Sequence, residues 1–268
     1  MLHPLLIGIG VLMVTHSIVS HTGAESLKEE LHRCGLTVVF DNVPQRADLE
    51  TGWGYACLVE GFDRLLLFDT GSDGEVLLRN MKRLGHEPER IDTVFLSHSH
   101  GDHTGGLDAI LRANNKITVF YPASFPPDFQ RFLEVRGASG RRVRGPERLF
   151  ERVHSTGEMG TAVVEQGLVL ETPLGLVLLT GCAHPGIAEM AERTQEVFRQ
   201  PIRCIVGGFH LQGAGRGRME SVAKKLMRLG VRGVAPSHCT GESARGLFRE
   251  LWGNEFIESG LGASIRFP

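Results

Sequence analysis

The order of apolar and polar positions along the chain predicts short strands that alternate with amphipathic helices. In the first third, three apolar runs separated by turn residues are typical of a β-meander, at residues 36–40, 55–59 and 64–68. Residues 74–85 then repeat apolar side chains at helical spacing and end on glycine, which predicts an amphipathic helix. A further apolar run at 91–96 predicts a strand that leads directly into a histidine-rich turn.

The second half of the chain shows the same alternation. Two β-type runs, 167–171 and 176–180, flank the sequence TPLG, whose proline and glycine suit a type I turn, so the pair predicts a hairpin. A helix that begins with Pro185 at its first position is predicted at 185–199. Strands in alternation with helices favour an α/β fold of two sheets covered by helices. The remaining helices are predicted at 107–113, 218–229 and 242–252, and the remaining strands at 117–121, 202–206 and 231–235.

Composition narrows the class of protein. At 268 residues the chain is long enough to bury a substantial core, and 41% hydrophobic with 22% charged residues is ordinary for a soluble globular protein. The formal net charge of −2 gives no general attraction to nucleic acid or to an anionic membrane, so no nucleic-acid partner is expected. The five cysteines are odd in number and scattered, so they do not resemble a disulfide framework.

The N-terminal segment leaves two interpretations open. Residues 4–14 form an apolar run that is too short for an ordinary membrane span and suits the core of a signal peptide. Only His3 precedes this run, where such a signal usually carries lysine or arginine. This segment is predicted to be either an export or anchoring signal in residues 1–24 or an incidental addition. Membrane contact is expected only through this segment, and the location is left open between cytoplasmic and exported or anchored.

The run SHSHGDHTGG at residues 97–106 is the strongest chemical signal in the sequence. It places four ligand-type side chains directly after the predicted strand 91–96, namely His98, His100, Asp102 and His103. His98 and His100 are two apart, so they leave the strand on the same side. Asp102 and His103 follow a glycine, whose freedom lets the backbone bend until they face a second ion. Imidazole and carboxylate in this pattern predict one or two divalent ions, with zinc expected and iron or manganese as alternatives.

With Asp69-Thr70-Gly71 upstream, this motif resembles the metallo-β-lactamase superfamily. The resemblance extends from about Leu36 to the C-terminus. It implies that residues 35–268 form an αββα sandwich and that residues 1–34 are an N-terminal extension. It is closest to one branch, the dihydropterin ribofuranosylaminobenzene 5'-phosphate synthase-like proteins. Three motifs carry that closer similarity: LTGCAHPGI at 179–187, GGFHL at 207–211 and SHCTG at 237–241.

The resemblance implies two sets of ligands, each at the ends of strands. The first site would be formed by His98, His100 and His184. The second would be formed by Asp102, His103 and His238. Two alternatives stay open, because His184 could hold a backbone group at a helix N-terminus and His238 could be a polar residue at a strand end.

Other residues near these motifs are candidates for catalysis or support. His210 in GGFHL is predicted to act beside the metals without binding them, although a ligand, a proton donor to the leaving group and a substrate-anion contact remain alternatives. Asp102 is predicted to be catalytic as well as a ligand. Asp69 is predicted to accept a hydrogen bond from a ligand imidazole or from loop N–H groups, with a simple turn aspartate as the alternative. Asp41 and Asn42 are suggested by the family resemblance to face the same cleft.

The sequence departs from the commonest superfamily pattern, in which a late aspartate bridges two metals. The chain contains no aspartate after Asp128, so none can fill that role from the second half. Cys182 occupies roughly that place, and a thiolate is a competent zinc ligand. The alternative is a small buried cysteine with no role in binding. Without a bridging carboxylate, the second ion is expected to bind more weakly.

Residues 131–152 hold seven arginines, no lysine and three glutamates. Because arginine forks match phosphate oxygens, one or two of them could select an anionic small-molecule substrate from a lid over the metals. A solvated arginine-rich loop is the favoured alternative. The seven are Arg131, Arg136, Arg141, Arg142, Arg144, Arg148 and Arg152.

The metal motif predicts a hydrolase in which a hydroxide generated at the metals attacks an ester, lactone or phosphodiester near neutral pH. The branch resemblance implies another reaction, the condensation of a dihydropterin pyrophosphate with an aminobenzene ribofuranosyl phosphate. Both reactions need cations beside an anionic substrate, so the ligand motifs do not separate them. A non-catalytic metal-binding protein is the third possibility, and the intact set of ligands argues against it.

Overall fold

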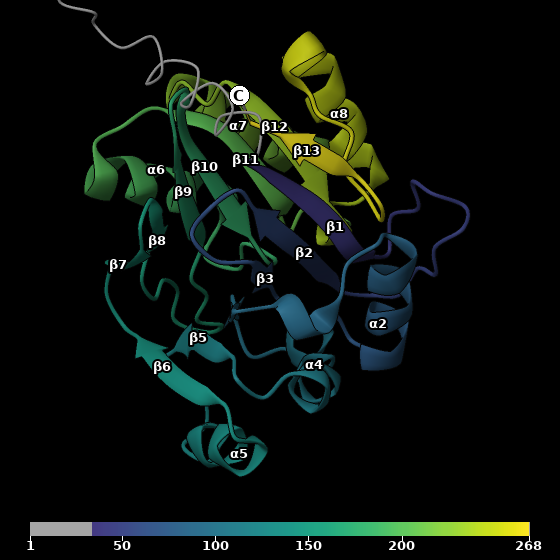
Figure 1. Cartoon of the computed structure of the whole chain (residues 1–268). Helices are drawn as coiled ribbons and strands as arrows, with labels where there is room; N and C mark the ends of the chain where they lie inside the picture. The colour runs from purple at the N-terminus through teal and green to yellow at the C-terminus, as the bar shows by residue number, and fades with distance from the viewer. Residues whose placement is uncertain (1–33, 268) are drawn as a thin grey trace, which may run out of the picture.

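Two β-sheets pack face to face, and helices cover both outer faces, in the computed structural model of residues 34–267 (Figure 1). This is the αββα sandwich that the sequence predicts, and it is an α/β fold. The predicted extension, apart from Cys34, lies outside the described residues. Within residues 34–267, no helix is long and apolar enough to cross a membrane.

The first sheet contains seven strands in the order β13-β1-β2-β3-β4-β5-β6. Its first half is antiparallel, whereas β3, β4, β5 and β6 all run parallel. The carboxyl ends of these four strands therefore lie at one edge. The strand bounds are β1 Gly35–Asp41, β2 Tyr55–Glu60, β3 Leu66–Phe68, β4 Thr93–Phe95, β5 Thr118–Pro122, β6 Ser139–Val143 and β13 Ser264–Arg266.

The second sheet contains six strands in the order β12-β11-β10-β9-β8-β7. Strands β10, β11 and β12 run parallel, and the β9–β10 hairpin pairs Thr172 with Gly175 around the predicted turn. The bounds are β7 Glu147–Phe150, β8 Val153–Ser155, β9 Leu168–Thr172, β10 Gly175–Thr180, β11 Ile202–Gly208 and β12 Gly233–Ser237.

Three buried apolar layers hold the sandwich together. The layer between the sheets includes Leu36 and Val38 from β1 and Val177 and Leu179 from β10. A second layer joins the first sheet to α2, α4 and α5, and a third joins the second sheet to α6, α7 and α8. The helix bounds are α2 Gly74–Arg83, α3 Gly101–Thr104, α4 Leu107–Ala113, α5 Phe129–Arg136, α6 Ile187–Phe198, α7 Arg216–Arg228 and α8 Glu242–Trp252, with short 3-10 turns η1 Pro88–Arg90, η2 His238–Thr240 and η3 Gly253–Glu255.

The helix predicted at 185–199 begins later than expected, at Ile187. Proline was expected at its first position, but Gly186 has φ 103° and Ala183 has φ 60°, so the chain is still turning there. Neither value is compatible with a right-handed helix. The local sequence favours a helix from residue 185, but contacts with distant segments determine the loop conformation that precedes Ile187.

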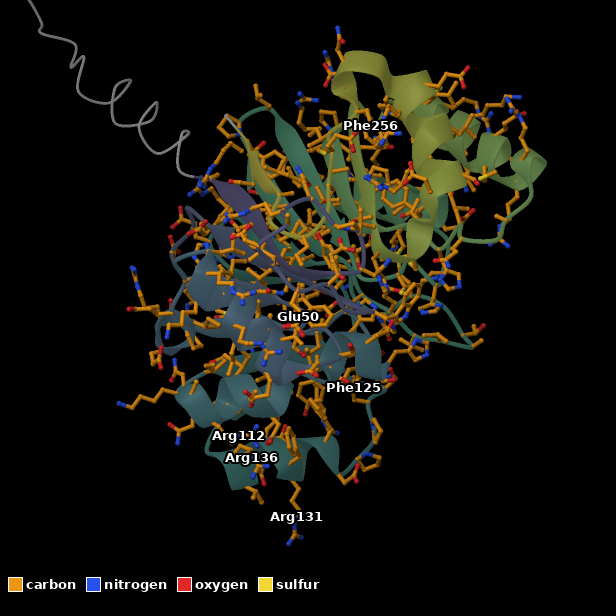
Figure 2. The ribbon with its side chains drawn as sticks, turned by 90° about the vertical axis from the view of Figure 1, so that its right-hand side faces the viewer. Glu50, Arg112, Phe125, Arg131, Arg136 and Phe256 are labelled. Carbon is orange, nitrogen blue, oxygen red and sulfur yellow. The ribbon has the colours of Figure 1, made fainter. Side chains whose placement is uncertain are left out.

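The arginine-rich segment was expected to lie as a lid or loop between the two halves, and this was wrong. Residues 131–152 instead form most of α5 and the edge strands β6 and β7. Arg136 pairs with Asp108, and Arg141 lies over the ring of Phe120. Figure 2 shows Arg131 and Arg136 on α5 at the bottom of the molecule, with Arg131 extending outward.

Candidate metal centre

The predicted ligands lie at one edge of the sandwich because they follow strands whose carboxyl ends meet there. Strand β4 leads into the motif at 97–103, whose second half forms the short helix α3. In the other sheet, the parallel strands β10, β11 and β12 lead to His184, His210 and His238. The two faces of the site are therefore supplied by different sheets.

The structure brings the first predicted set, His98, His100 and His184, together. Their potential ligand atoms lie within 4.8 Å of one another, and the ring centroids are 4.7 Å apart for His98 and His100 and 4.8 Å apart for the other two pairs. The buried Nε2 atoms of His98 and His184 have no hydrogen-bond partner among the described residues. Buried polar atoms are normally paired, so these nitrogens suit a ligand between them.

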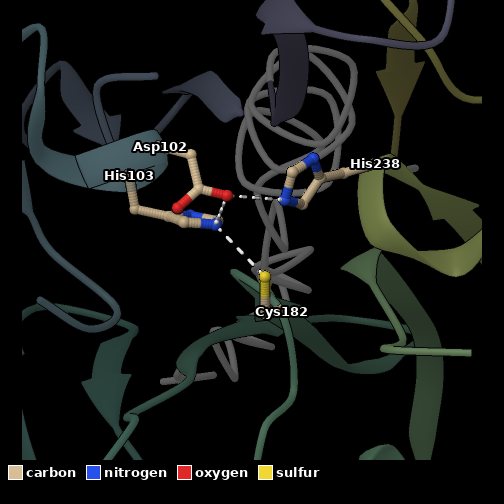
Figure 3. Close-up of side chains that lie close together, drawn as sticks. All are labelled: Asp102, His103, Cys182 and His238. Atoms are coloured by element: carbon tan, nitrogen blue, oxygen red, sulfur yellow. Dashed lines mark hydrogen bonds and ion pairs between the residues drawn. The ribbon is translucent and has the colours of Figure 1, made fainter. Parts of the chain in front are cut away.

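The second predicted set also converges, and Cys182 joins it (Figure 3). Asp102 Oδ2 lies 3.6 Å from His103 Nε2 and 3.5 Å from His238 Nε2. Cys182 Sγ lies 3.2 Å from His103 Nε2. One carboxylate, two imidazoles and a thiol thus face one point, and the position of Cys182 favours a role as ligand over that of a simple buried cysteine.

Asp69 fixes the orientation of His103. Its carboxylate accepts hydrogen bonds from the Ser97 N–H, from Ser97 Oγ and from His103 Nδ1, each at 2.7 Å. Because Asp69 can only accept, Nδ1 carries the proton and the Nε2 lone pair faces Asp102 and Cys182. The Ser97 hydroxyl donates its hydrogen bond to Asp69, so its oxygen accepts a hydrogen bond from His98 Nδ1 at 2.9 Å. Asp69 is therefore the supporting carboxylate that the sequence suggested.

Asn42 fixes the orientation of His238, as Asp69 fixes that of His103. Its Oδ1 lies 2.7 Å from His238 Nδ1, and its Nδ2 donates to the His238 carbonyl at 3.3 Å. The neighbouring Asp41 accepts from the Val43 N–H and from Ser237 Oγ, which anchors the end of β1 to the end of β12. Both residues of the Asp41-Asn42 pair therefore support the site.

Burial keeps His98 and His184 neutral. It lowers the pKa of His98 far below its usual range, helped by the neighbouring His103 and His184, and it lowers the pKa of His184 to about 4. Neutral imidazole is the form that binds a metal. Although burial opposes ionisation of Asp102, the neighbouring imidazoles of His238 and His103 lower its pKa, so the carboxylate is anionic at neutral pH.

Glu165 is a supporting residue that no sequence motif marks. The carboxylate is fully buried, and its Oε1 accepts the N–H groups of Gly181, Cys182 and Ala183, while Oε2 accepts that of His184. One side chain thereby fixes the loop that carries two candidate ligands. In the sequence, Glu165 resembles any polar loop residue, so only the tertiary structure reveals this role.

Backbone strain gathers at the same edge. Six non-glycine residues among those described have positive φ, and four of them surround the site: Asp69, Ala183, His210 and His238. Such conformations persist only where surrounding contacts enforce them, and they are concentrated at functional sites.

His210 lies where the sequence placed it, beside the first set. Its ring centroid is 4.4 Å from that of His184, and its side chain is partly exposed. With Cys182 and Cys239 it forms a third close group of potential ligand atoms. A hydrogen bond to Cys239 raises the pKa of His210, while hydrogen bonds from Cys182 and His210 lower the pKa of Cys239 to about 4. His210 thus lies beside the first set, and proton donation stays one of the alternatives for its role.

The ligand role of His238 can be tested against a histidine outside the site. His154 lies on β8, with Nε2 3.1 Å from Glu171 and its ring 5.2 Å from that of Phe198. We expect His238→Ala to bind about one metal ion fewer per chain, because it removes one of four donors. His154→Ala should bind as much metal as the wild type. Equal metal content in the two variants, measured by atomic emission, would refute the assignment.

Comparisons with known proteins agree with this geometry. The profile of the metallo-beta-lactamase superfamily matches residues 54–238. The chain is 31% identical over 263 residues to the 7,8-dihydropterin-6-methyl-4-(beta-D-ribofuranosyl)-aminobenzene-5'-phosphate synthase of Methanocaldococcus jannaschii, with 80% of this chain and 90% of that protein covered. A shorter match, 33% identical over 75 residues, links it to the ribonuclease Z of Nanoarchaeum equitans, covering 26% of this chain and 23% of that enzyme.

Solved structures show the same arrangement of sheets and helices. The crystal structure of Tm1679, described as a metal-dependent hydrolase of the beta-lactamase superfamily, superposes with a TM-score of 0.73 at 28% identity. That match covers 87% of this chain and 98% of Tm1679.

Proposed function

The chain belongs to the metallo-beta-lactamase superfamily, and we propose that it is a metal-dependent hydrolase of an anionic ester, lactone or phosphodiester. The superfamily and the relatives indicate an enzyme. The observation that carries the proposal is the pair of adjacent donor groups, His98, His100 and His184 beside Asp102, His103, Cys182 and His238.

The donor atoms fit two divalent cations. The buried Nε2 atoms of three histidines, His98, His184 and His238, lack hydrogen-bond partners among residues 34–267. Other residues hold these histidines in place, through Nδ1 in His98 and His238 and through the backbone N–H in His184. Imidazole and thiolate donors favour zinc over magnesium or calcium, with iron or manganese as alternatives. The first group offers three imidazole nitrogens, which leaves room for a further ligand such as water or substrate.

We assign a residue to each part of the proposed reaction. Bound cations would supply a water of lowered pKa and would polarise the substrate oxygen under attack. Asp102, 19% exposed and anionic, would orient the attacking water by accepting its hydrogen bond. His210, partly exposed beside His184, would donate the proton from its ring to the leaving oxygen. Asp69 and Glu165 would keep the ligand-bearing loops in place.

A synthase is the second candidate, favoured by the Methanocaldococcus jannaschii relative that covers most of both chains. A condensation that expels a phosphorylated leaving group would use the same cations to neutralise its charge. We place the hydrolase first because one fold and one metal site can serve several reactions, so similarity to a synthase does not fix the reaction. The pocket around the metals sets the selectivity.

One preparation can test these candidates together with the non-catalytic alternative. Metal content and turnover would be measured on the same sample, with a chromogenic phosphodiester, a lactone, and the two pterin-pathway substrates. Hydrolysis that disappears with a chelator and returns with zinc would support the first candidate. Formation of product only from the dihydropterin pyrophosphate and the aminobenzene ribofuranosyl phosphate would favour the synthase. Full metal content without any turnover would favour a binding protein.

Of the seven arginines, Arg144 is the one that we propose to contact an anionic substrate. It directly follows β6 at the edge where β4 delivers the metal motif, and its side chain is 82% exposed. The nearest carboxylate is Glu158 at 3.9 Å, in a loop that continues to Gln166 and its backbone hydrogen bond with Ser97.

The Arg144→Ala variant should therefore raise KM for phosphorylated substrates about tenfold, since a lost charge-assisted hydrogen bond costs roughly 1.5–3 kcal/mol. Metal content and kcat should change little. Arg131→Ala on α5 is the matched control and should leave KM unchanged (Figure 2). If both variants keep the wild-type KM, the arginine-rich segment does not select substrate.

A further inference from the structure

A third group of potential ligand atoms lies beside the two groups assigned above. It consists of the Sγ atoms of Cys182 and Cys239 and a ring nitrogen of His210, all within 4.8 Å of one another. Each residue comes from a different motif, namely LTGCAHPGI, SHCTG and GGFHL. These motifs follow β10, β12 and β11, which are parallel neighbours, so the three loops meet at one edge of the sheet.

Hydrogen bonds on both sides of His210 place it next to Cys239. The N–H of the preceding residue, Phe209, donates to Thr240 Oγ1, and the Gln212 N–H donates to the Cys239 carbonyl oxygen, each at 3.0 Å. The loop after β11 is thereby tied to the turn after β12. The imidazole is therefore brought to the thiol by the fold of the backbone.

Gly208 lets the two cysteine-bearing segments approach each other. A Cβ at this position would lie 2.7 Å from Cys239 Sγ and would collide with the Gly181 carbonyl oxygen. Cys239 Sγ in turn lies 3.6 Å from the carbonyl oxygen of Cys182. Both cysteines are buried, whereas His210 is exposed, so an ion would reach the two sulfurs from the side of the imidazole.

The donors of this group differ from those of the other two. Two thiols and one imidazole, without a carboxylate, favour a thiophilic cation such as zinc over magnesium or calcium. A tetrahedral zinc ion binds thiolate sulfur at about 2.3 Å, which places two sulfur ligands about 3.8 Å apart. Small side-chain rotations bring atoms that lie within 4.8 Å to this spacing. A thiolate also has more than one lone pair, so Cys182 can bind an ion in this group and another in the second group.

We propose that Cys182, His210 and Cys239 form a third cation site, which takes zinc when the other two groups are filled and shares the Cys182 thiolate with the second group. The ion forms bonds to both sulfurs and to the lone pair of one His210 nitrogen, and any proton displaced from them passes to solvent. A metal-bound imidazole cannot become an imidazolium ion, so it is a poor proton donor. Zinc at this site therefore inhibits the enzyme. The inhibition rests on the proposed function, whereas the site itself does not.

Metal analysis after equilibrium dialysis tests the site without turnover. At excess zinc we expect the full-length wild type to hold one ion more per chain than Cys239→Ala or His210→Ala. Because His210 is exposed, His210→Ala tests the site even if Cys239→Ala is unstable. Cys204→Ala, which removes a buried thiol from the core between the sheets, should hold as much zinc as the wild type. Equal zinc content in the wild type and His210→Ala would overturn the site.

Cobalt shows whether the additional ion is bound by sulfur. When the wild type is saturated with Co²⁺, we expect strong thiolate-to-cobalt charge-transfer absorption in the near ultraviolet, with contributions from Cys182 and Cys239. Cys239→Ala should lose most of this absorption, because only the bond from Cys182 to the second ion remains. Absorption as strong as that of the wild type would mean that the additional ion is adventitious and lies elsewhere.

Turnover tests the inhibition separately from the site. Excess zinc should lower kcat of the wild type about a hundredfold relative to limiting zinc, since a general acid contributes about 10²–10⁴-fold. Cys239→Ala, compared with itself at the two zinc concentrations, should show no such fall. A third ion that leaves kcat unchanged would keep the site and refute the inhibition. A third ion in a protein that turns over none of the substrates would sustain the site and refute the hydrolase.

Discussion

The Cys182→Ala variant is expected to bind one metal ion fewer than the wild type at limiting zinc and to lose about a hundredfold or more in metal affinity at the second group. Its Sγ lies 3.2 Å from His103 Nε2, among donors that have no carboxylate from the second half of the chain. Even residues that only support ligands are worth about 10–100-fold in metal affinity, so a ligand should be worth at least the upper end. Metal analysis and kcat on the same sample measure both effects.

Two further variants distinguish a ligand from a buried thiol. Cys182→Asp supplies the carboxylate that the commonest superfamily pattern has, and it should retain both ions. Cys204→Ala removes a thiol of similar burial from the core between the sheets, so it should cost stability and leave metal content unchanged. Full metal content in Cys182→Ala would mean that Cys182 merely fills space next to His103.

The parts of the site carried by local motifs could be predicted from the sequence. The spacing of His98, His100 and His103 after a buried strand determines where those side chains leave the sheet, so the strand and its ligands are encoded together. Asp69 could be suggested because its motif ends β3, which pairs directly with β4. Helices α4 and α8 have the predicted bounds because their apolar periodicity is complete within the segment.

The remaining parts depend on contacts between distant segments. Strand β13 pairs with β1 from the far end of the chain, and its three residues carry no periodicity of their own. Strand β6 is rich in arginine and was expected to be loop, yet Ser139–Val143 pairs with β5 because the long arginine side chains can extend to solvent or lie over neighbouring rings. Glu165 acquires its role only when β10 brings residues 181–184 to it.

The loop at residues 181–184, which carries two candidate ligands, thus depends on Glu165, a residue that no sequence motif marks. The Glu165→Ala variant should show this. Four N–H groups, of Gly181 through His184, would lose their acceptor, and all of them except that of His184 are fully buried. Each unpaired buried donor costs about 1–3 kcal/mol, so the free energy of unfolding should fall by about 4 kcal/mol or more.

Metal binding should weaken together with stability, since the same loop positions Cys182 and His184, one for each group of ligands. Glu165→Gln, which keeps one oxygen for the first three N–H groups, is expected to lie between the wild type and the alanine variant. Glu158→Ala is the matched control, because that carboxylate accepts a single N–H, from Ser124, in the same connection between strands. Urea unfolding and zinc titration measure the two effects. A Glu165→Ala protein as stable as Glu158→Ala and with wild-type zinc affinity would show that the ligand loop holds its conformation without this carboxylate.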